Sequence, residues 1–424
     1  DGMYLTDMDG NRLLDAFAGL WCVNVGYGQE TIVEAAAEQM RRLPYATGYF
    51  SYASEPAIRL AETLVGLSPA NLTRVYLTLG GSDSVDSAVR FITHYYNATG
   101  RPAKKQMIAL DKGYHGSSTT GAGLTGLPAF HRQFDLPLGW QHHIPAPYPY
   151  RSPVGDDPQA VIDRSVADLR AKVAELGAEN VAAFFAEPVQ GSGGVIVPPP
   201  GWLTAMRRVC TELDILLVVD EVITGFGRTG PMFACETEGV EPDLMTLAKG
   251  LTAGYVPMGA VLMSEAIYAG IADGPDSHLP VGHGATYSGH PVSAAVALEV
   301  LRLYQEGGIL ANGQQRAPQL AAGLAELGHH PLVGDVRQAG MLAALELVRD
   351  KATKARFPGE LGLAERLAQA GYRHGIIFRA FGDGTIGLAP ALSCSEQDMA
   401  ILVQRLRATL DEVLAQREVC DIMA

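Results

Sequence analysis

The chain has 424 residues, of which 47% are hydrophobic and 18% are charged, as expected for a large globular protein with an extensive core. Its formal net charge of −14 argues against nucleic acid as a partner, because nucleic-acid phosphates are bound through basic surfaces. No apolar stretch reaches the roughly 18 residues that span a bilayer, and the N-terminus lacks the pattern of a signal peptide. We therefore expect a cytoplasmic protein that binds no membrane.

Cysteine and histidine patterns indicate neither a disulfide framework nor a metal site. The five cysteines are widely scattered and odd in number, and none forms a CxxC pair. Two pairs of histidines are adjacent in the sequence, His142 with His143 and His329 with His330, and adjacent side chains seldom face one ion. There is no HExxH motif, so we expect no metal.

The N-terminal region predicts a hairpin followed by a helix. Asp9 and Gly10 form a DG pair, which is typical of a hairpin turn. Residues 31–43 then follow a helical pattern.

Short apolar runs alternate with amphipathic segments in the middle of the chain. Because the runs are continuously apolar, both faces of each strand are expected to be covered. The pattern predicts an α/β fold with a mainly parallel central sheet and helices on both sides. The predicted strands are residues 75–79, 107–110, 181–186, 215–219 and 259–263, and the clearest helices are residues 84–96 and 160–176.

The C-terminal part has a different pattern, with helices flanking shorter strands. Strands are predicted over 341–348 and 375–380, and a closing amphipathic helix over 396–416. We expect a smaller α+β domain built from both ends of the chain. The predicted domains are an N-terminal segment of the small domain (1–44), a large domain (45–295) and the C-terminal small domain (296–424).

Ligands of open α/β sheets collect beyond the carboxyl ends of the strands, so the residues that follow each strand are candidates for a site. After strand 75–79 come Gly80 to Ser84, at the start of a helix. Free N–H groups and close backbone approach there suit an anion such as a phosphate. The alternative is an ordinary glycine turn in which Ser82 or Asp83 caps the helix.

Three further strand ends carry Tyr114, Glu187 and Asp220. Tyr114 lies in a glycine-flanked loop and is a candidate for stacking on a flat ligand, although packing is the commoner role of a loop tyrosine. Asp220 ends a buried apolar run, and a buried carboxylate is costly unless a cation meets it.

Lys249 follows a short apolar segment and precedes a glycine. A desolvated lysine with a lowered pKa is a Schiff-base nucleophile, whereas a surface lysine with a buried stem is the alternative. A phosphate site, an aromatic, a carboxylate and a lone lysine together match the needs of pyridoxal 5′-phosphate (PLP), whose pyridinium would be the cation beside Asp220.

The segments "VVDEVITGFGRTG", "LAKGLTAGYVPMGAV" and "HGATYSGHPVSAAVALE" resemble the class III aminotransferases of PLP fold type I. Within that family, "GLWCVNVGYG" and "FRAFGDGTIGLAPAL" resemble the ω-transaminases that use pyruvate, including amine:pyruvate and polyamine:pyruvate transaminases. The resemblance covers nearly the whole chain, with the motifs in the family's order.

The resemblance implies a role for each matching residue. Lys249 corresponds to the Schiff-base lysine and Asp220 to the partner of the pyridinium. The other implied cofactor contacts are Val222 and Tyr114 on the two ring faces, Gly81 and Ser82 at the phosphate, Glu187 beside the cofactor, and Thr286, which reaches the phosphate of the neighbouring subunit. The implied substrate-binding residues are Trp21, Tyr49, Phe50, Tyr114 and a mobile arginine, Arg379.

The implied function is transfer of an amino group from a primary amine to pyruvate by a ping-pong mechanism, giving alanine and an aldehyde or ketone. A polyamine, an ω-amino acid and a long-chain amine are all candidate donors. The implied assembly is a homodimer with shared active sites, and whether dimers pair into tetramers is left open. Two positions depart from the family: Gly80 replaces a common serine, and Ala285 replaces a bulky aromatic.

Two other classes of function are weighed against this one. An aminomutase or decarboxylase of the same fold would share most of these residues. A nicotinamide-dependent oxidoreductase is suggested by "GAGLTG" at 121–126, which satisfies GxGxxG, but this segment does not directly follow a predicted strand.

Overall fold

The structure is a computed structural model that describes residues 1–49, 51–279 and 281–423. The chain divides into two compact units. The terminal unit comprises Asp1–Gln29, Phe226–Pro231 and Arg302–Ala424, and the central unit comprises Glu30–Gly225 and Met232–Leu301. Both ends of the chain therefore belong to one unit. The sequence-based domain boundaries at residues 44 and 295 stay a prediction.

The central unit is built on a 7-stranded sheet with the order β3-β9-β8-β7-β6-β4-β5. Its strands pair in parallel except β9, which is antiparallel to both neighbours. The predicted mainly parallel sheet is thus confirmed. The strands are β3 (Leu72–Thr78), β4 (Gln106–Leu110), β5 (Gln141–Ile144), β6 (Val181–Ala186), β7 (Leu216–Asp220), β8 (Leu244–Leu247) and β9 (Gly259–Ser264).

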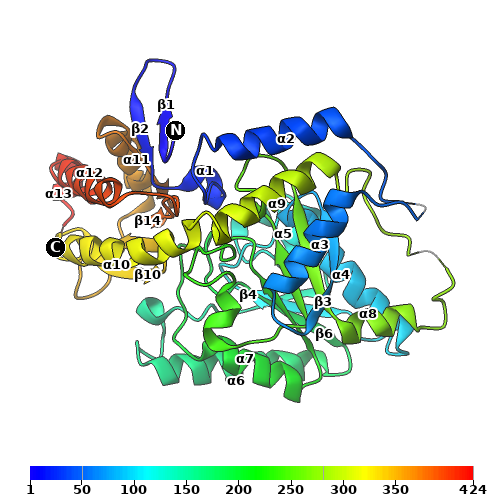
Figure 1. Cartoon of the computed structure of the whole chain (residues 1–424). Helices are drawn as coiled ribbons and strands as arrows, with labels where there is room; N and C mark the ends of the chain where they lie inside the picture. Colours follow the sequence, from blue (N-terminus) through cyan, green and yellow to red (C-terminus); the bar gives the residue numbers. More distant parts are fainter. Residues whose placement is uncertain (50, 280, 424) are drawn as a thin grey trace. The chain divides into compact units, whose positions relative to one another are not determined.

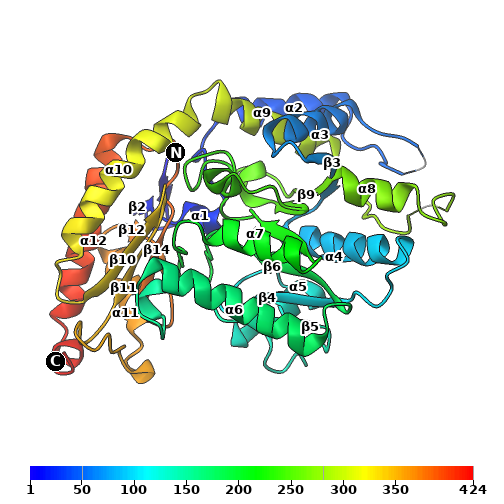
Figure 2. The ribbon, with the colours of Figure 1, turned by 90° about the horizontal axis from the view of Figure 1, so that it is seen from below.

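Helices cover the sheet because its strands are apolar on both faces (Figures 1 and 2). Helix α4 packs on one face, where its Val85 and Phe91 join a core with Phe185 and Val218. The alternate residues of the same strands, such as Phe184, are also fully buried, so the opposite face is covered as well. In both views α6 and α7 lie side by side along the sheet.

The helices of the central unit include two that the sequence predicts at 84–96 and 160–176. They are α2 (Glu30–Arg42), α3 (Glu55–Leu67), α4 (Gly81–Ala98), α5 (Thr119–Leu124), α6 (Pro158–Leu176), α7 (Trp202–Glu212) and α8 (Glu265–Ala272), with 3-10 turns η1 (Pro128–Phe130), η2 (Pro149–Arg151), η3 (Ala234–Glu238) and η4 (Lys249–Leu251). Helix α9 (Pro291–Gln305) leads from the central into the terminal unit.

The terminal unit contains two small sheets. The predicted hairpin forms β1 (Tyr4–Thr6) and β2 (Arg12–Asp15), and β2 also pairs with β12 (Ile376–Ile377). The second sheet has the order β10-β11-β14-β13. Its strands are β10 (Val333–Ala339), β11 (Leu342–Leu347), β14 (Thr385–Leu388) and β13 (Arg379–Ala380), and the helices of this unit are α1 (Ala18–Trp21), α10 (Ile309–Leu327), α11 (Leu363–Arg373), α12 (Glu396–Leu414), α13 (Arg417–Cys420) and the 3-10 turn η5 (Gly359–Leu361).

One predicted strand of the terminal unit is wrong in its extent. Residues 375–380 form two short strands, because β12 pairs with β2 whereas β13 pairs with β14 of the other sheet. At Phe378 the chain passes from one small sheet to the other, and the apolar character of the sequence could not reveal that change.

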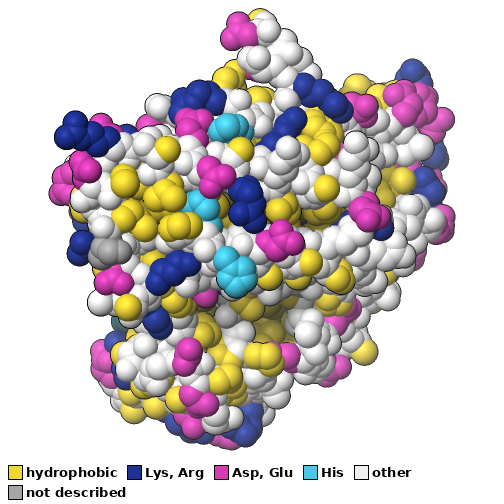
Figure 3. All heavy atoms as spheres, turned by 90° about the vertical axis from the view of Figure 1, so that its left-hand side faces the viewer, with side chains coloured by type: hydrophobic (Ala, Val, Ile, Leu, Met, Phe, Trp, Pro, Cys, Tyr) yellow, Lys and Arg dark blue, Asp and Glu magenta, His cyan; other side chains and the backbone are white. Residues whose placement is uncertain are grey.

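Charged side chains of both signs share the surface. On the face drawn in Figure 3, lysine and arginine side chains are interspersed with aspartate and glutamate and with apolar groups. None of the helices in the described ranges is both long and apolar enough to cross a membrane.

Candidate active site

Asp220 ends strand β7 and is buried, with 3% of its surface exposed. Its Oδ1 accepts a hydrogen bond from the Val222 amide at 3.1 Å. Its Oδ2 lies 2.8 Å from Nδ1 of His115, which is also buried. The carboxylate that the sequence places at the end of a buried strand therefore has a histidine partner within the protein, which the sequence reasoning missed.

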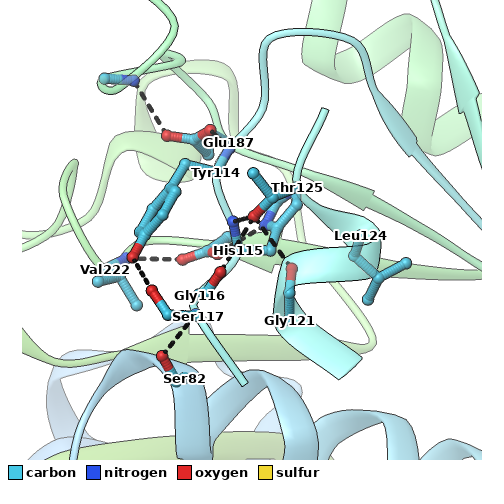
Figure 4. Close-up of polar contacts among 12 residues, drawn as sticks. Ser82, Tyr114, His115, Gly116, Ser117, Gly121, Leu124, Thr125, Glu187 and Val222 are labelled. Carbon is cyan, nitrogen blue, oxygen red and sulfur yellow. Dashed lines mark hydrogen bonds and ion pairs between the residues drawn. The ribbon is translucent and has the colours of Figure 1, made fainter. Parts of the chain in front are cut away.

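His115 is held by the loop that follows β4 (Figure 4). Its backbone N–H donates to the Thr125 hydroxyl at 2.8 Å. Burial opposes protonation of the ring, but the hydrogen bond and the charge of Asp220 outweigh it, so the pKa of His115 is raised. The Nε2 atom is buried and has no hydrogen-bond partner among the described residues. When the ring is protonated, His115 therefore forms an ion pair with Asp220.

Glu187 follows β6 and is buried beside this pair. Its two oxygens accept backbone hydrogen bonds from Tyr114 at 2.8 Å and from Gly191 at 3.0 Å. Burial and the negative charge of Asp220 raise the pKa of Glu187 to about 7, although the charge of His115 acts to lower it. Glu187 therefore fixes the backbone that carries Tyr114, and it titrates near neutrality.

Lys249 begins η4 directly after β8, and β8 is the neighbour of β7, with Thr246 opposite Asp220. The Lys249 ammonium lies 6.0 Å from the ring centroid of Tyr114. Its backbone φ is +39°, in the left-handed region that non-glycine residues seldom adopt. The sheet order thus brings Lys249, Tyr114 and Asp220 to one edge.

Gly81 and Ser82 form the first turn of α4, at the end of β3. A Cβ on Gly81 would lie only 3.1 Å from Cγ1 of Val222, so the glycine permits close contact with the residue after Asp220. The Ser82 hydroxyl accepts a hydrogen bond from the Ser117 amide at 3.1 Å, and the Ser117 hydroxyl lies 3.0 Å from that of Tyr114 (Figure 4).

The start of α4 has no side-chain hydrogen-bonded cap. The alternative in which Ser82 or Asp83 caps the helix is therefore wrong, and the first amides of the helix are left for another acceptor.

Three further predicted site residues are Thr286, Tyr49 and Phe50. Thr286 is exposed, and its carbonyl accepts a hydrogen bond from the Tyr45 hydroxyl at 3.0 Å. Tyr49 is exposed beside Gly284, where a Cβ would overlap the tyrosine hydroxyl. Phe50 lies outside the described residues.

Trp21 and Arg379 both belong to the terminal unit, and both lie next to Gly387 of β14. Arg379 on β13 is opposite Gly387 on β14. A Cβ on Gly387 would lie 2.9 Å from Cη2 of Trp21. The two predicted substrate-binding residues, separated by most of the chain, are thus neighbours across Gly387.

The glycines of "GAGLTG" lie in and just after α5, and not in a turn that leads from a strand into a helix. Gly123 is closely packed, because a Cβ there would overlap the Gln141 side chain. A packing role explains these glycines better than a dinucleotide site. In the described part of the chain, no group of three or more histidine, cysteine, aspartate or glutamate side chains is arranged to hold a metal.

Comparison with known proteins gives the family. The family model described as "Aminotransferase class-III" matches residues 1–410. The chain belongs to the class III aminotransferases. It is 43% identical to a putrescine–pyruvate aminotransferase of Pseudomonas aeruginosa over 98% of this chain and 90% of the relative. A diaminobutyrate–2-oxoglutarate transaminase of Halomonas elongata is 37% identical over 97% of this chain and 89% of the relative.

A solved structure agrees with the fold. The ω-transaminase of Pseudomonas jessenii in complex with PMP has a TM-score of 0.95 and 39% identity, covering 98% of this chain and 91% of that chain. The chain is therefore an aminotransferase of PLP fold type I, acting on small molecules such as amines and keto acids, and its cofactor is PLP.

The residues present fit this cofactor. Asp220 and Glu187 are two buried acids that face a single histidine, and a carboxylate can accept more hydrogen bonds than Asp220 makes within the protein. A cationic ring nitrogen therefore suits the end of β7. The uncapped start of α4 suits a phosphate, and Lys249 lies on the neighbouring strand end.

Proposed function

We propose that this aminotransferase takes the amino group of a primary amine and passes it to pyruvate in two half-reactions. The donor is a polyamine, an ω-amino acid or a long-chain amine, and the products are alanine and an aldehyde or ketone. The name of the Pseudomonas aeruginosa relative supports both a diamine donor and the pyruvate acceptor. The single observation that carries the chemistry is the buried contact of His115 with Asp220, which ends the strand next to the one that leads to Lys249.

When bound, PLP supplies an aldehyde and a ring that withdraws electrons from the reacting carbon. Lys249 would hold the cofactor through Nζ, and its amine would serve as the acid and base that carries a proton to and from the substrate carbon. Its Nζ lies 6.0 Å from the ring centroid of Tyr114, so the lysine and this aromatic side chain would meet the same ligand.

Asp220 would be the partner of the cofactor's ring nitrogen and would keep it protonated, and His115 orients that carboxylate. Tyr114 and Val222 are proposed for the two ring faces. Glu187 fixes the backbone amide of Tyr114 and thereby the position of its ring. These roles need rigid backbone, and each residue lies at or just after a strand end.

Gly81 and Ser82 are proposed for the phosphate, together with Thr286 of a second copy of the chain. Thr286 is exposed, and so are the neighbouring aromatic residues Tyr45 and Tyr287, whose rings are 6.1 Å apart. Exposed apolar groups around a proposed cofactor contact support a homodimer in which two sites are shared. Tetramers and a cytoplasmic location stay predictions.

For the substrate we propose Trp21, Tyr49, Phe50 and Tyr114 as amine-binding residues and Arg379 as the carboxylate ligand. Arg379 is exposed, and its guanidinium lies over the ring of Phe381. A guanidinium with its N–H edge exposed can meet the carboxylate of a keto acid in one half-reaction and leave that position in the other.

The test is a product assay with purified enzyme. Putrescine and pyruvate should give alanine in amounts equal to the carbonyl product, and Lys249→Ala should abolish both. Lys351→Ala is the matched control, because Lys351 is exposed and donates only to the Gly328 carbonyl among the contacts that the structure gives. Absence of alanine with every primary amine would contradict the proposal.

A second acceptor is favoured by the relative that uses 2-oxoglutarate. The same assay distinguishes it, because glutamate would then form in place of alanine. An aminomutase or decarboxylase would consume the amine-bearing substrate without any keto acid, and this outcome would also be visible.

A further inference from the structure

Arg379 contacts an aromatic ring in the terminal unit. Its guanidinium carbon lies 5.2 Å from the ring centroid of Phe381, within the range of a cation–π interaction. Arg379 is exposed, whereas only 9% of Phe381 is exposed. The ring is thus a fixed group beneath a charged side chain that reaches solvent.

The strand geometry makes this pairing specific. Side chains two residues apart in extended backbone share a face, so Arg379 of β13 and Phe381, which follows β13, lie on the same side of the chain. Phe378 is equally buried but lies on the other side, where a Cβ on Gly371 of α11 would be 2.7 Å from its ring. Phe378 therefore packs the strand on α11, whereas Phe381 faces the arginine.

The Phe381 ring is held in place across the strand pair. Gly387 is opposite Arg379, and a Cβ there would lie 2.8 Å from Cε2 of Phe381 and 2.9 Å from Cη2 of Trp21. Only a residue without a side chain leaves room for both rings. Trp21 is in turn packed edge-on against Phe17, with ring centroids 4.6 Å apart.

A guanidinium can use its face and its edge at the same time. The face stacks on an aromatic ring, while the edge presents a fork of N–H donors that matches a carboxylate. A ring that holds the face limits the rotamers of the long side chain and lowers the entropy lost when a carboxylate binds.

We infer that Phe381, kept in position by Gly387, is a positioning residue that orients Arg379 for the carboxylate of the keto-acid acceptor. This inference rests on the proposed role of Arg379 in the transfer to pyruvate. With a donor that has no carboxylate, such as putrescine, Phe381 acts on only one half-reaction.

The test compares steady-state constants of PLP-loaded variants with putrescine and pyruvate varied in turn. Phe381→Leu should raise the KM for pyruvate about two- to five-fold, the size of a lost cation–π contact, and leave the KM for putrescine and kcat unchanged. Phe381→Tyr keeps the ring face and should restore the wild-type KM. Gly387→Ala displaces the Phe381 ring and should likewise raise the KM for pyruvate.

Phe378→Leu is the matched control, because it removes an equally buried ring from the opposite side of the strand. It should leave both KM values unchanged even if it lowers Tm. Equal changes of both KM values in Phe381→Leu, or a Phe381→Tyr variant as impaired as Phe381→Leu, would refute the inference. If Arg379→Leu leaves the KM for pyruvate unchanged, the proposed role of Arg379 fails, and that result is separate from any effect of Phe381.

Discussion

His115 Nδ1 lies 2.8 Å from Asp220 Oδ2, and both side chains are buried. This contact joins the loop after β4 to the end of β7, although β6 lies between these strands in the sheet. A carboxylate that must hold a cofactor's ring nitrogen is most effective when its own rotamer is fixed. The histidine fixes it and also supplies charge that offsets the cost of burial.

We therefore expect His115→Leu to impair both catalysis and cofactor binding. Loss of a hydrogen bond to a charged group costs about 1.5–3 kcal/mol, so kcat/KM should fall roughly 10- to 100-fold. His115→Asn keeps a short donor and should lose less. PLP retention after dialysis, measured by absorbance alongside kcat/KM, checks the prediction, with exposed His329→Leu as the control. Equal activity of the Leu variant and the wild type would count against the role of His115.

Glu187 gives the cofactor-free protein a pH-dependent stability. Its pKa is raised to about 7 by burial, so the folded state binds this proton more tightly than the unfolded chain does. The stabilisation is complete below the unfolded pKa of about 4.5 and is lost as the pH rises through about 7. In Glu187→Gln this dependence should disappear, although one of the two backbone amides loses its acceptor.

The measurement is urea unfolding of the cofactor-free protein at several pH values between about 5 and about 8. The difference in free energy of unfolding between wild type and Glu187→Gln should shrink as the pH rises. Glu360→Gln, at an exposed position, should run parallel to the wild type. A pH-independent difference would mean that Glu187 is ionised throughout.

The sequence predicted the central sheet well because five of its strands are continuous apolar runs, such as Val181–Ala186. It named β8 (Leu244–Leu247) only as a short apolar segment. It did not predict β5, whose residues Gln141–Ile144 include two histidines and read as polar. The strand is identified only by its pairing with β4, which is a tertiary contact. Hydrophobic periodicity carries no information of that kind.

The candidate active site likewise contains residues that the sequence could predict and a contact that it could not. Asp220, Glu187 and Lys249 could be predicted because each follows an apolar strand, and parallel strands bring their ends to one edge. The partnership of His115 with Asp220 could not, because it depends on the order of strands in the sheet and on the loop backbone that Thr125 holds. The adjacency of His115 to Tyr114 in a glycine-flanked loop was the one available signal.

Gly80 offers a direct gain-of-function test at the start of α4. Its φ of 172° is extended backbone open to any residue, and a Cβ there would meet nothing within 4 Å. Gly80→Ser should therefore fold normally and add a hydroxyl near the proposed phosphate site. One hydrogen bond to a charged group would tighten PLP binding about 10-fold.

The PLP dissociation constant of Gly80→Ser, from titration of the cofactor-free protein, checks this expectation. Gly139→Ser is the matched control, because a Cβ on Gly139 also meets nothing within 4 Å. Unchanged PLP affinity in Gly80→Ser would place the phosphate away from this turn.

The proposed sharing of active sites between two chains predicts complementation between two impaired variants. Lys249→Ala should be inactive, and Thr286→Val should bind PLP about 10-fold more weakly through loss of one hydrogen bond to a charged group. In a dimer of one chain of each variant, one site has both changes and the other has neither. Co-expression with two different affinity tags isolates this heterodimer, and one of its sites should retain PLP and activity at limiting PLP. If Thr286 instead served the site of its own chain, every site of the heterodimer would carry one change, and no site with wild-type affinity would form.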